Sequence, residues 1–222
     1  AVVGEEVTSR GALYDDRYAG NVLLINNSRD AIGEALIYLG YSVNTTDEDQ
    51  IREAFALVAD ANRRGVFQGR VMDEIFQKME GGNAAIATYY AGDYLSMVDN
   101  QAEGVDLAFV IPEEGSNWFV DAMCMLKDAP HQREAHMWIN FIASTEANLA
   151  NMDYIWYASP NREALERYPA YYEELYGEEL DRSLYEIMAA PPETLARCEA
   201  YLNLPPETLN LYKSLWTQLG AN

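Results

Sequence analysis

The chain has 222 residues with 36 acidic and 15 basic side chains, which gives a formal net charge of −21. Such a field repels phosphate backbones, so the composition excludes a nucleic-acid binder that relies on a Lys/Arg surface. Hydrophobic residues make up 49% of the chain, which predicts a packed core in one or two domains. No apolar run is long enough to predict a membrane-spanning helix.

The first half of the chain alternates predicted strands with predicted helices. Short apolar runs predict strands at residues 21–25, 84–89, 107–111 and 119–126. Apolar residues at helical spacing predict helices at residues 31–39, 47–64, 72–79 and 94–98, the last after a turn at 91–93. Asn27 or Ser28 is expected to cap the first helix, and Thr46 the second. The alternation favours an α/β domain with a mostly parallel sheet.

The second half is predicted to be helical. Helices are expected at residues 132–142 and 145–152, from residue 161, and after the proline pairs 191–192 and 205–206. The stretch 168–185, rich in Tyr and Glu, is expected to cover a surface. Cys124 lies in an apolar run and is predicted to be a buried, inert thiol, whereas Cys198 lies in a helical pattern. A disulfide between them stays open.

Signatures of enzymes and metal sites are missing from the sequence. It has no nucleophile elbow, no phosphate-binding loop and no dinucleotide fingerprint. His131 and His136 are five residues apart, so they cannot form the i,i+4 zinc pair of a helix and are expected at the surface. We therefore predict a protein that is not an enzyme and that has no cofactor and no metal site.

Polar and aromatic residues gather at the ends of the predicted strands, where ligands of open α/β sheets bind. Residues 26–30 follow the first strand, residues 89–93 follow the second, and Phe119 and Asp121 share one side of a third. Aromatic faces attract a cation and carboxylates bind its N–H groups, so this pattern favours an organic ammonium ligand. Ordinary core or interface packing stays open as the other interpretation.

Several short segments match those of a known family in order and spacing. They are Tyr18-Ala-Gly-Asn-Val-Leu-Leu-Ile25, Ser28-Arg-Asp30, Leu39-Gly-Tyr-Ser-Val-Asn-Thr-Thr-Asp47, Tyr90-Ala-Gly-Asp93, Val110-Ile-Pro-Glu-Glu-Gly115, Trp118-Phe-Val-Asp121, Trp138-Ile-Asn-Phe-Ile142 and Tyr157-Ala-Ser-Pro-Asn161. With these segments the chain resembles the substrate-binding component of the bacterial spermidine/putrescine ABC transporter, a type II bilobal binding protein. The resemblance runs from about residue 15 to the C-terminus.

The resemblance implies an α/β fold, a type II periplasmic-binding-protein-like lobe with a mostly parallel central sheet flanked by helices, largely lacking the N-terminal lobe. Residues 1–115 would form the second lobe, residues 116–160 would cross over to complete the first lobe, and residues 161–222 would return as helices. An apolar strand in the crossover segment would lack partners. We therefore expect it to repack or to pair between chains, as a homodimer or a swapped dimer.

The resemblance also implies a ligand site in which rings lie along the methylenes of a polyamine and carboxylates meet its amines. Its residues here would be the rings Tyr90, Phe119 and Tyr157, the carboxylates Asp30, Asp93 and Asp121, and the amide Asn27. Tyr90 stands where the family usually has Trp, and Asn27 where some members have Asp. The choice between spermidine and putrescine therefore stays open.

The implied function is the extracytoplasmic solute-binding component of a polyamine ABC importer. Its lobes would close on the cation, and the closed form would be presented to permease subunits in the membrane. The chain begins without a methionine or a signal-peptide pattern. We therefore expect any targeting signal, or a fusion to the permease, to lie outside this sequence.

Two other functions stay open. A type II binding protein for ferric iron would use paired tyrosines such as Tyr89–Tyr90 or Tyr171–Tyr172, although neighbouring strand residues face opposite ways. An acidic hydrolase would need two carboxyl groups about 5–9.5 Å apart in one cleft. A coloured protein would identify the first and turnover the second.

Overall fold

The computed structural model describes residue 3 and residues 7–220. The chain divides into two compact units. Unit 1 comprises residues 1–89, 97–119 and 192–222, and unit 2 comprises residues 90–96 and 120–191. The division into a second lobe, a crossover segment and a helical return stays a prediction.

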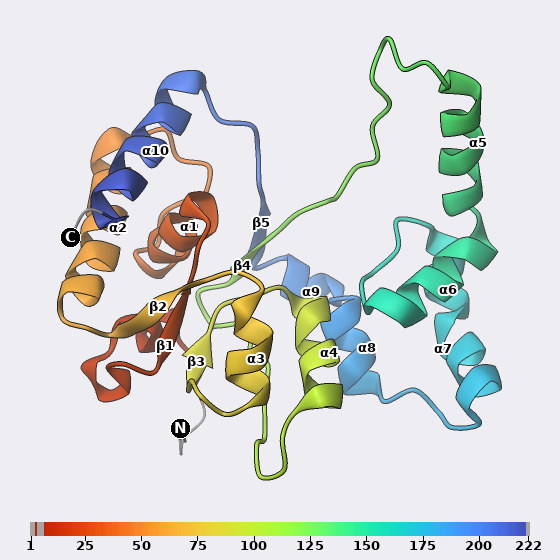
Figure 1. Cartoon of the computed structure of the whole chain (residues 1–222), viewed down its shortest axis with the longest axis horizontal. Helices are drawn as coiled ribbons and strands as arrows, with labels where there is room; N and C mark the ends of the chain where they lie inside the picture. The colour runs from red at the N-terminus through yellow and green to blue at the C-terminus, as the bar shows by residue number, and fades with distance from the viewer. Residues whose placement is uncertain (1–2, 4–6, 221–222) are drawn as a thin grey trace. The chain divides into compact units, whose positions relative to one another are not determined.

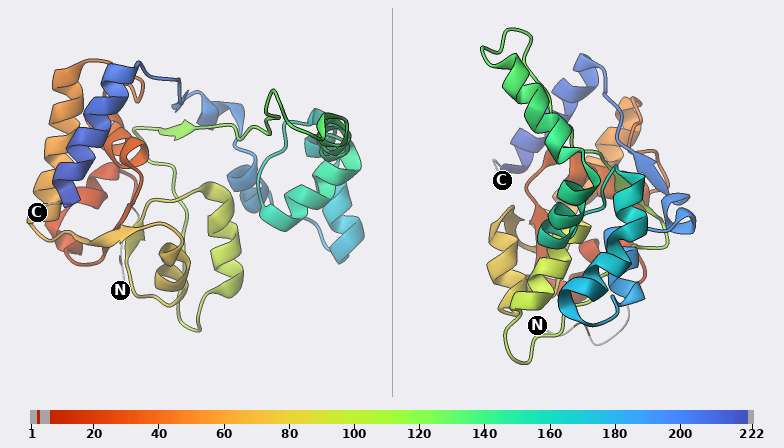
Figure 2. Two further views of the ribbon diagram at one scale, coloured as in Figure 1. Left: turned by 45° about the horizontal axis from the view of Figure 1, so that its top comes forward. Right: turned by 90° about the vertical axis from the view of Figure 1, so that its right-hand side faces the viewer.

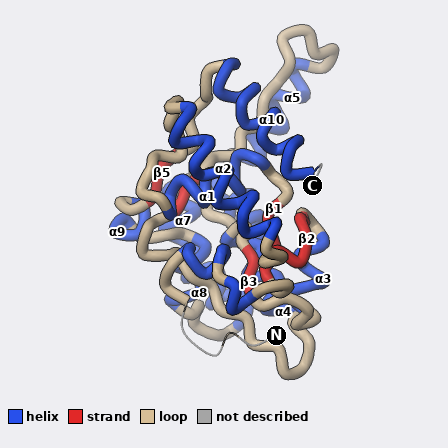
Figure 3. The backbone as a smooth tube through the Cα atoms, turned by 90° about the vertical axis from the view of Figure 1, so that its left-hand side faces the viewer, coloured by secondary structure: helices blue, strands red, loops and turns tan. Residues whose placement is uncertain are grey.

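The centre of unit 1 is a three-stranded parallel sheet in the order β2-β1-β3 (Figures 1 and 3). Its strands are β1 (Val22–Ile25), β2 (Phe67–Val71) and β3 (Ile86–Ala87). All four residues of β1 are buried, because this middle strand has a neighbour on each edge and packing on both faces. The sheet confirms the predicted α/β fold with parallel strands.

Unit 1 also contains several α-helices, including the end of α4. They are α1 (Ser28–Tyr38), α2 (Glu48–Arg63), α3 (Glu74–Glu80), α4 (Ala91–Asn100), the short α9 (Pro192–Leu195) and α10 (Pro206–Gly220). Helices α1, α2 and α10 contact one another. On α3, Ile75 packs with Leu23 of β1 and with Met97 near the end of α4. β1 ends at Ile25 and α1 begins at Ser28. The predicted ligand residues Asn27 and Asp30 lie at this junction.

A second, two-stranded parallel sheet joins distant parts of unit 1. Its strands are β4 (Ser116–Trp118) and β5 (Cys198–Ala200). Two short 3-10 helices, η1 (Arg10–Tyr14) and η2 (Asp16–Tyr18), precede β1. The buried Arg10 guanidinium donates to the Gly115 carbonyl from Nε at 3.2 Å and from Nη2 at 3.0 Å. The N-terminal segment is thereby fixed to the start of β4.

Unit 2 is helical (Figure 2). Its hydrophobic core includes a buried tyrosine, and several other tyrosines pack against it. Its helices, besides the start of α4, are α5 (Gln132–Ile142), α6 (Thr145–Ile155), α7 (Arg162–Tyr176) and α8 (Arg182–Met188). Tyr168 of α7 is fully buried against Leu149 and Met152 of α6. Its hydroxyl donates to Asp153 Oδ1 at 3.3 Å. Part of the Tyr-rich stretch is therefore core, which corrects the expectation of a surface layer.

The strand predictions for the middle of the chain are wrong. Residues 107–111 and 119–126 form no strand, and β4 ends at Trp118. Among the residues that the structure describes, neither segment belongs to either of the two sheets. Three strands were missed. They are β2, in which polar residues and Gly69 break the apolar pattern, β4, which ends just before the strand predicted at 119–126, and β5, which lies where a helix was expected.

Smaller corrections concern helix ends and cysteines. Asp47, rather than Thr46, caps α2 by accepting from Asp49 N at 2.9 Å. Residues 91–93, predicted as a turn, are the first turn of α4. Cys124 is exposed rather than buried, as are its neighbours at residues 119–123. Cys124 and Cys198 are both free thiols.

Candidate functional site

The first group of predicted ligand residues lies where β1 passes into α1. Asn27 is the N-cap of α1, and its Oδ1 accepts from Arg29 N at 2.9 Å and from Asp30 N at 3.4 Å. This arrangement satisfies N–H groups that have no partner within the helix. The carbonyl oxygen of the Asn27 amide is therefore engaged in the cap, so the structure gives this residue a local role beside any contact with a ligand.

Asp30, in the first turn of α1, is buried at a fixed position. Tyr201, just after β5, donates its hydroxyl to Asp30 Oδ1 at 3.0 Å and lies 3.3 Å from the Arg29 carbonyl. Burial, and then the neighbouring Asp30, raise the pKa of Tyr201, so the phenol keeps its proton and acts as a donor. Sequence reasoning missed Tyr201, because it lies 171 positions away in a segment expected to be helical.

One helical turn further along α1, Glu34 extends this acidic group into the core. Its Oε2 accepts from Thr88 Oγ1 at 3.0 Å. Burial raises the pKa of Glu34 to about 7, and Asp30 adds to the rise, while Arg10 and Thr88 oppose it. Two carboxyl groups therefore lie at the i and i+4 positions of one buried helix face, with Tyr201 and Thr88 as their hydroxyl donors.

The second group of predicted residues lies in unit 2, at the start of α4. Tyr90 immediately precedes this helix, and Asp93 lies in its first turn, where a negative charge suits the helix dipole. Gly92 lies between them and touches the ring of Tyr157. A Cβ placed on Gly92 would be 2.4 Å from two carbons of that ring and 2.7 Å from the Trp156 carbonyl oxygen. Only glycine allows so close an approach.

Trp156 explains why Tyr157 reaches α4. Trp156 ends α6 in the left-handed conformation, with φ of 58°, and its N–H donates to Met152 O at 2.9 Å. A left-handed residue turns the chain sharply after a helix, and it is uncommon for a bulky side chain. This turn brings Tyr157 next to the segment that carries Tyr90 and Asp93, so three of the predicted residues are neighbours within unit 2.

The remaining two predicted residues lie in an extended segment. Phe119 follows β4 directly, and Asp121 comes two residues later; both side chains are exposed. The predicted arrangement on one side of a strand is wrong, because no strand forms there. Across the chain, Asn27, Asp30 and Phe119 belong to unit 1, whereas Tyr90, Asp93, Asp121 and Tyr157 belong to unit 2.

Residues considered for other chemistry have ordinary surroundings. His131 and His136 are exposed, and His131 is the N-cap residue of α5, without a side-chain capping bond. In residue 3 and residues 7–220, no three His, Cys, Asp or Glu side chains are grouped as a metal site would require. Tyr171 and Tyr172 both pack on the ring of Tyr168, with centroids 6.3 Å away in each case. The described helices include none with the length and apolar character of a membrane span.

The sequence is similar to a known family and to several proteins of known name. The family described as "Bacterial extracellular solute-binding protein" matches residues 9–173. The putrescine/agmatine-binding protein of Pseudomonas aeruginosa is 26% identical over 147 residues, which cover 65% of this chain and 40% of that protein. The spermidine/putrescine-binding periplasmic protein of Escherichia coli is 28% identical over 162 residues, covering 72% of this chain and 45% of that protein.

A solved structure shows the same fold. The spermidine/putrescine ABC transporter substrate-binding protein of Streptococcus pneumoniae superposes with a TM-score of 0.77 at 26% identity, over 99% of this chain and 63% of that chain. The chain thus spans less than half the length of the curated relatives it matches. These proteins give no support to the ferric-iron or hydrolase alternatives.

Proposed function

The chain belongs to the family of bacterial extracellular solute-binding proteins, and from this membership we propose that it takes part in capturing a polyamine outside the cytoplasm for an ABC importer. The observation that carries the proposal is the close approach of the Tyr157 ring to Gly92, which places Tyr157 beside the segment that carries Tyr90 and Asp93 within unit 2. Rings and a carboxylate form the environment that an alkyl ammonium requires. Two of the matched relatives are named as binding proteins for putrescine and agmatine, and for spermidine and putrescine. These names support the same ligand class.

In the proposed site, each residue has a chemical role. Asp30, Asp93 and Asp121 would accept hydrogen bonds from ligand ammonium groups. Tyr90, Tyr157 and Phe119 would pack along the methylenes, and Asn27 would supply an amide contact. Tyr201 would hold the Asp30 carboxylate in position, because its hydroxyl already donates to Oδ1. Capture would end in lobe closure and presentation to permease subunits.

Calorimetric titration with putrescine and spermidine at low salt tests the proposal. We expect saturable binding that Asp30→Asn and Asp93→Asn each weaken by about tenfold or more, since a charge-assisted hydrogen bond contributes roughly 1.5–3 kcal/mol. Asp106→Asn is the matched control, because it removes one exposed loop carboxylate by the same change. Equal affinity in all four proteins would contradict the site, and silence in a chain extended to the relatives' full length would contradict the ligand class.

Helix α5 supports a proposal about assembly. None of its residues is buried, and Met137, Trp138 and Phe141 are each more than half exposed. Adjacent large apolar side chains of this kind usually mark an interaction surface. We propose that this apolar face of α5, which lies within residues 116–160, pairs between two copies of the chain.

Light scattering coupled to size exclusion would test this pairing. We expect the chain at micromolar concentration to contain dimer, and Phe141→Glu to return it to monomer, because a buried glutamate in an apolar interface lacks a partner. Asn140→Glu adds the same charge at a neighbouring exposed position that is not apolar, and should leave the dimer intact. A wild-type chain that is monomeric throughout the concentration series would overturn the proposal.

A further inference from the structure

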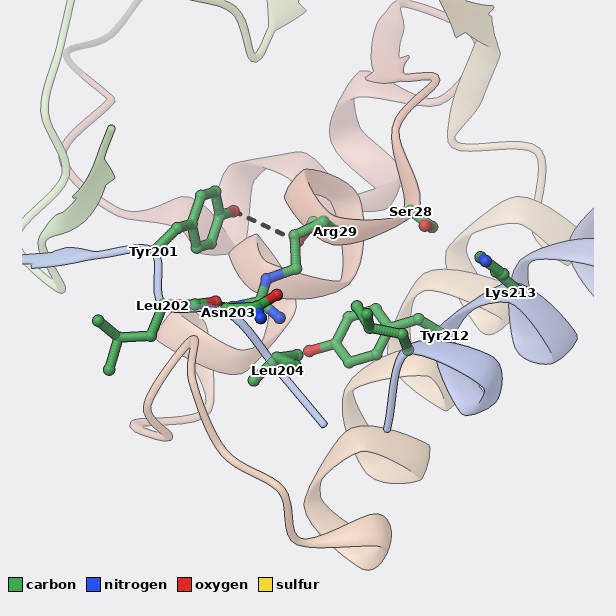
Figure 4. A pocket seen from close by; sticks show the side chains of 9 residues that line it. Ser28, Arg29, Tyr201, Leu202, Asn203, Leu204, Tyr212 and Lys213 are labelled. Atoms are coloured by element: carbon green, nitrogen blue, oxygen red, sulfur yellow. Dashed lines mark hydrogen bonds between the residues drawn. The ribbon is translucent and has the colours of Figure 1, made fainter. Parts of the chain in front are cut away.

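Unit 1 contains a pocket of about 220 Å³ that the polyamine proposal does not use (Figure 4). Its walls are the first turn of α1, the segment that follows β5, and the first half of α10. Pockets for drug-sized molecules are larger, at roughly 300–1,000 Å³. This one has the size for a small organic molecule.

The charge of the lining is opposite to that of the chain. Arg29 and Lys213 both line the pocket, and no Asp or Glu does. The whole chain carries 36 acidic and 15 basic residues, so a lining with two cations and no carboxylate departs from the rest of the sequence. Leu204, Leu209 and the ring of Tyr201 make the remaining lining largely apolar. An anion with an apolar body matches both features.

The Tyr212 hydroxyl lacks a hydrogen-bond partner. Tyr212 of α10 is only 2% exposed, and its hydroxyl is buried with no partner in the described part of the chain. Figure 4 shows this hydroxyl directed toward Leu204 and the Arg29 guanidinium. Burial raises the pKa of Tyr212, so the group stays a donor at neutral pH. A buried donor is normally satisfied, and a ligand oxygen in the pocket would satisfy this one.

The Arg29 guanidinium is held in place by two aromatic rings and a hydrogen bond. Its guanidinium carbon lies 4.8 Å from the centre of the Tyr201 ring and 5.6 Å from that of the Tyr212 ring. Its Nη2 donates to Asn44 Oδ1 at 2.9 Å. A planar guanidinium fixed in this way binds a carboxylate with little loss of side-chain entropy.

We propose that this pocket is a binding site for a small carboxylate that carries an aliphatic or aromatic body. The carboxylate would lie at the Arg29 guanidinium and the Tyr212 hydroxyl, and the apolar body would pack on Leu204 and Leu209. Lys213, which lines the pocket on the side of Ser28, would add a more distant attraction for the anion. None of the seven residues proposed to bind the polyamine lines this pocket. Tyr201 does connect the two, because its hydroxyl contacts both the Arg29 carbonyl and Asp30. The inference does not depend on polyamine binding.

Titration of the isotope-labelled chain with benzoate, followed by backbone chemical shifts, tests the inference. We expect saturable shifts in α1 and α10 with a dissociation constant of about 1 mM, a usual affinity for a ligand of this size. Benzamide has the same ring and no charge, and should bind at least tenfold more weakly. Benzamide binding as well as benzoate, or benzoate producing no saturable shift, would overturn the proposal.

Two variants locate the site. Tyr212→Phe removes only the hydroxyl, and Lys213→Met removes an exposed charge, so both should keep the melting temperature while weakening benzoate at least fivefold. Lys127→Met, which changes the net charge equally in unit 2, is the control and should bind as the wild type does. Arg29 stays unchanged in these variants because it also holds Asn44. Unaltered benzoate affinity in both pocket variants would refute the assignment.

Discussion

The free energy of unfolding of this protein should fall as the pH rises from about 4.5 to about 7, because Glu34 is buried. The folded state raises the pKa of Glu34 from 4.5 to about 7, chiefly by burial. Between these values the folded chain keeps a proton that the unfolded chain releases. The stability that the folded state gains by holding Glu34 protonated is therefore fully present below pH 4.5, and it is lost as the pH rises through about 7. The shift corresponds to about 3 kcal/mol.

Glu34→Gln should remove this pH dependence. Glutamine keeps the shape and can still bond Thr88, but it does not ionise, so the variant should match the wild type near pH 5 and be more stable near pH 8. Urea unfolding at four pH values measures the difference. Glu103→Gln, at an exposed loop position, should run parallel to the wild type. If Glu34→Gln also ran parallel, the carboxyl group would not be buried as the structure has it.

Replacing Gly92 by alanine should destabilise unit 2 by about 2 kcal/mol or more and displace Tyr157. In a helix interior, alanine is favoured over glycine by roughly 1 kcal/mol. Here the new Cβ would lie 2.4 Å from the Tyr157 ring and 2.7 Å from a backbone oxygen, and overpacking of this kind costs roughly 1–3 kcal/mol, occasionally more. The clash therefore outweighs the helix preference, since backbone must move as well as a ring.

Chemical unfolding, together with the fluorescence of Trp156 beside Tyr157, would measure this effect. Gly69→Ala is the matched control, because nothing lies within 4 Å of its Cβ position. A second substitution, Tyr157→Ala, should recover part of the loss by removing the ring from the clash. A Gly92→Ala protein that is more stable than the wild type would show that Tyr157 does not pack on α4.

The sequence predicted those elements whose signals are local. The helix at 132–142 was located to the residue, and the Asn27 cap and the strand ending at Ile25 were also expected, because capping and periodicity depend on neighbours along the chain. β2 and β5 were missed because their few residues become strands only through partners far away in sequence. The strand predicted at residues 119–126 does not form, because β-propensity depends on the surroundings of a segment and does not by itself make a strand.

The same distinction applies to the candidate site. The approach of Tyr157 to Gly92 depends on Trp156 adopting a left-handed conformation, which nothing in its side chain favours. The bond from Tyr201 to Asp30 joins two segments that no periodicity connects. Family resemblance named Tyr157 and Asp30 without either contact. The structure shows which residues contact Tyr157 and Asp30. It also adds Tyr201 and Glu34 to the polar group at the start of α1.

The pairing of β4 with β5 also bears on the order in which the chain folds. Ser116 pairs with Cys198, so about 80 residues must be closed into a loop before the first hydrogen bond of this sheet forms. Loop closure of that length costs on the order of 4 kcal/mol in chain entropy, which three residues per strand repay poorly. Collapse of α6 and α7 around Tyr168 shortens the loop beforehand. We therefore expect amide protons of β5 to gain protection from exchange after those of α7 during refolding.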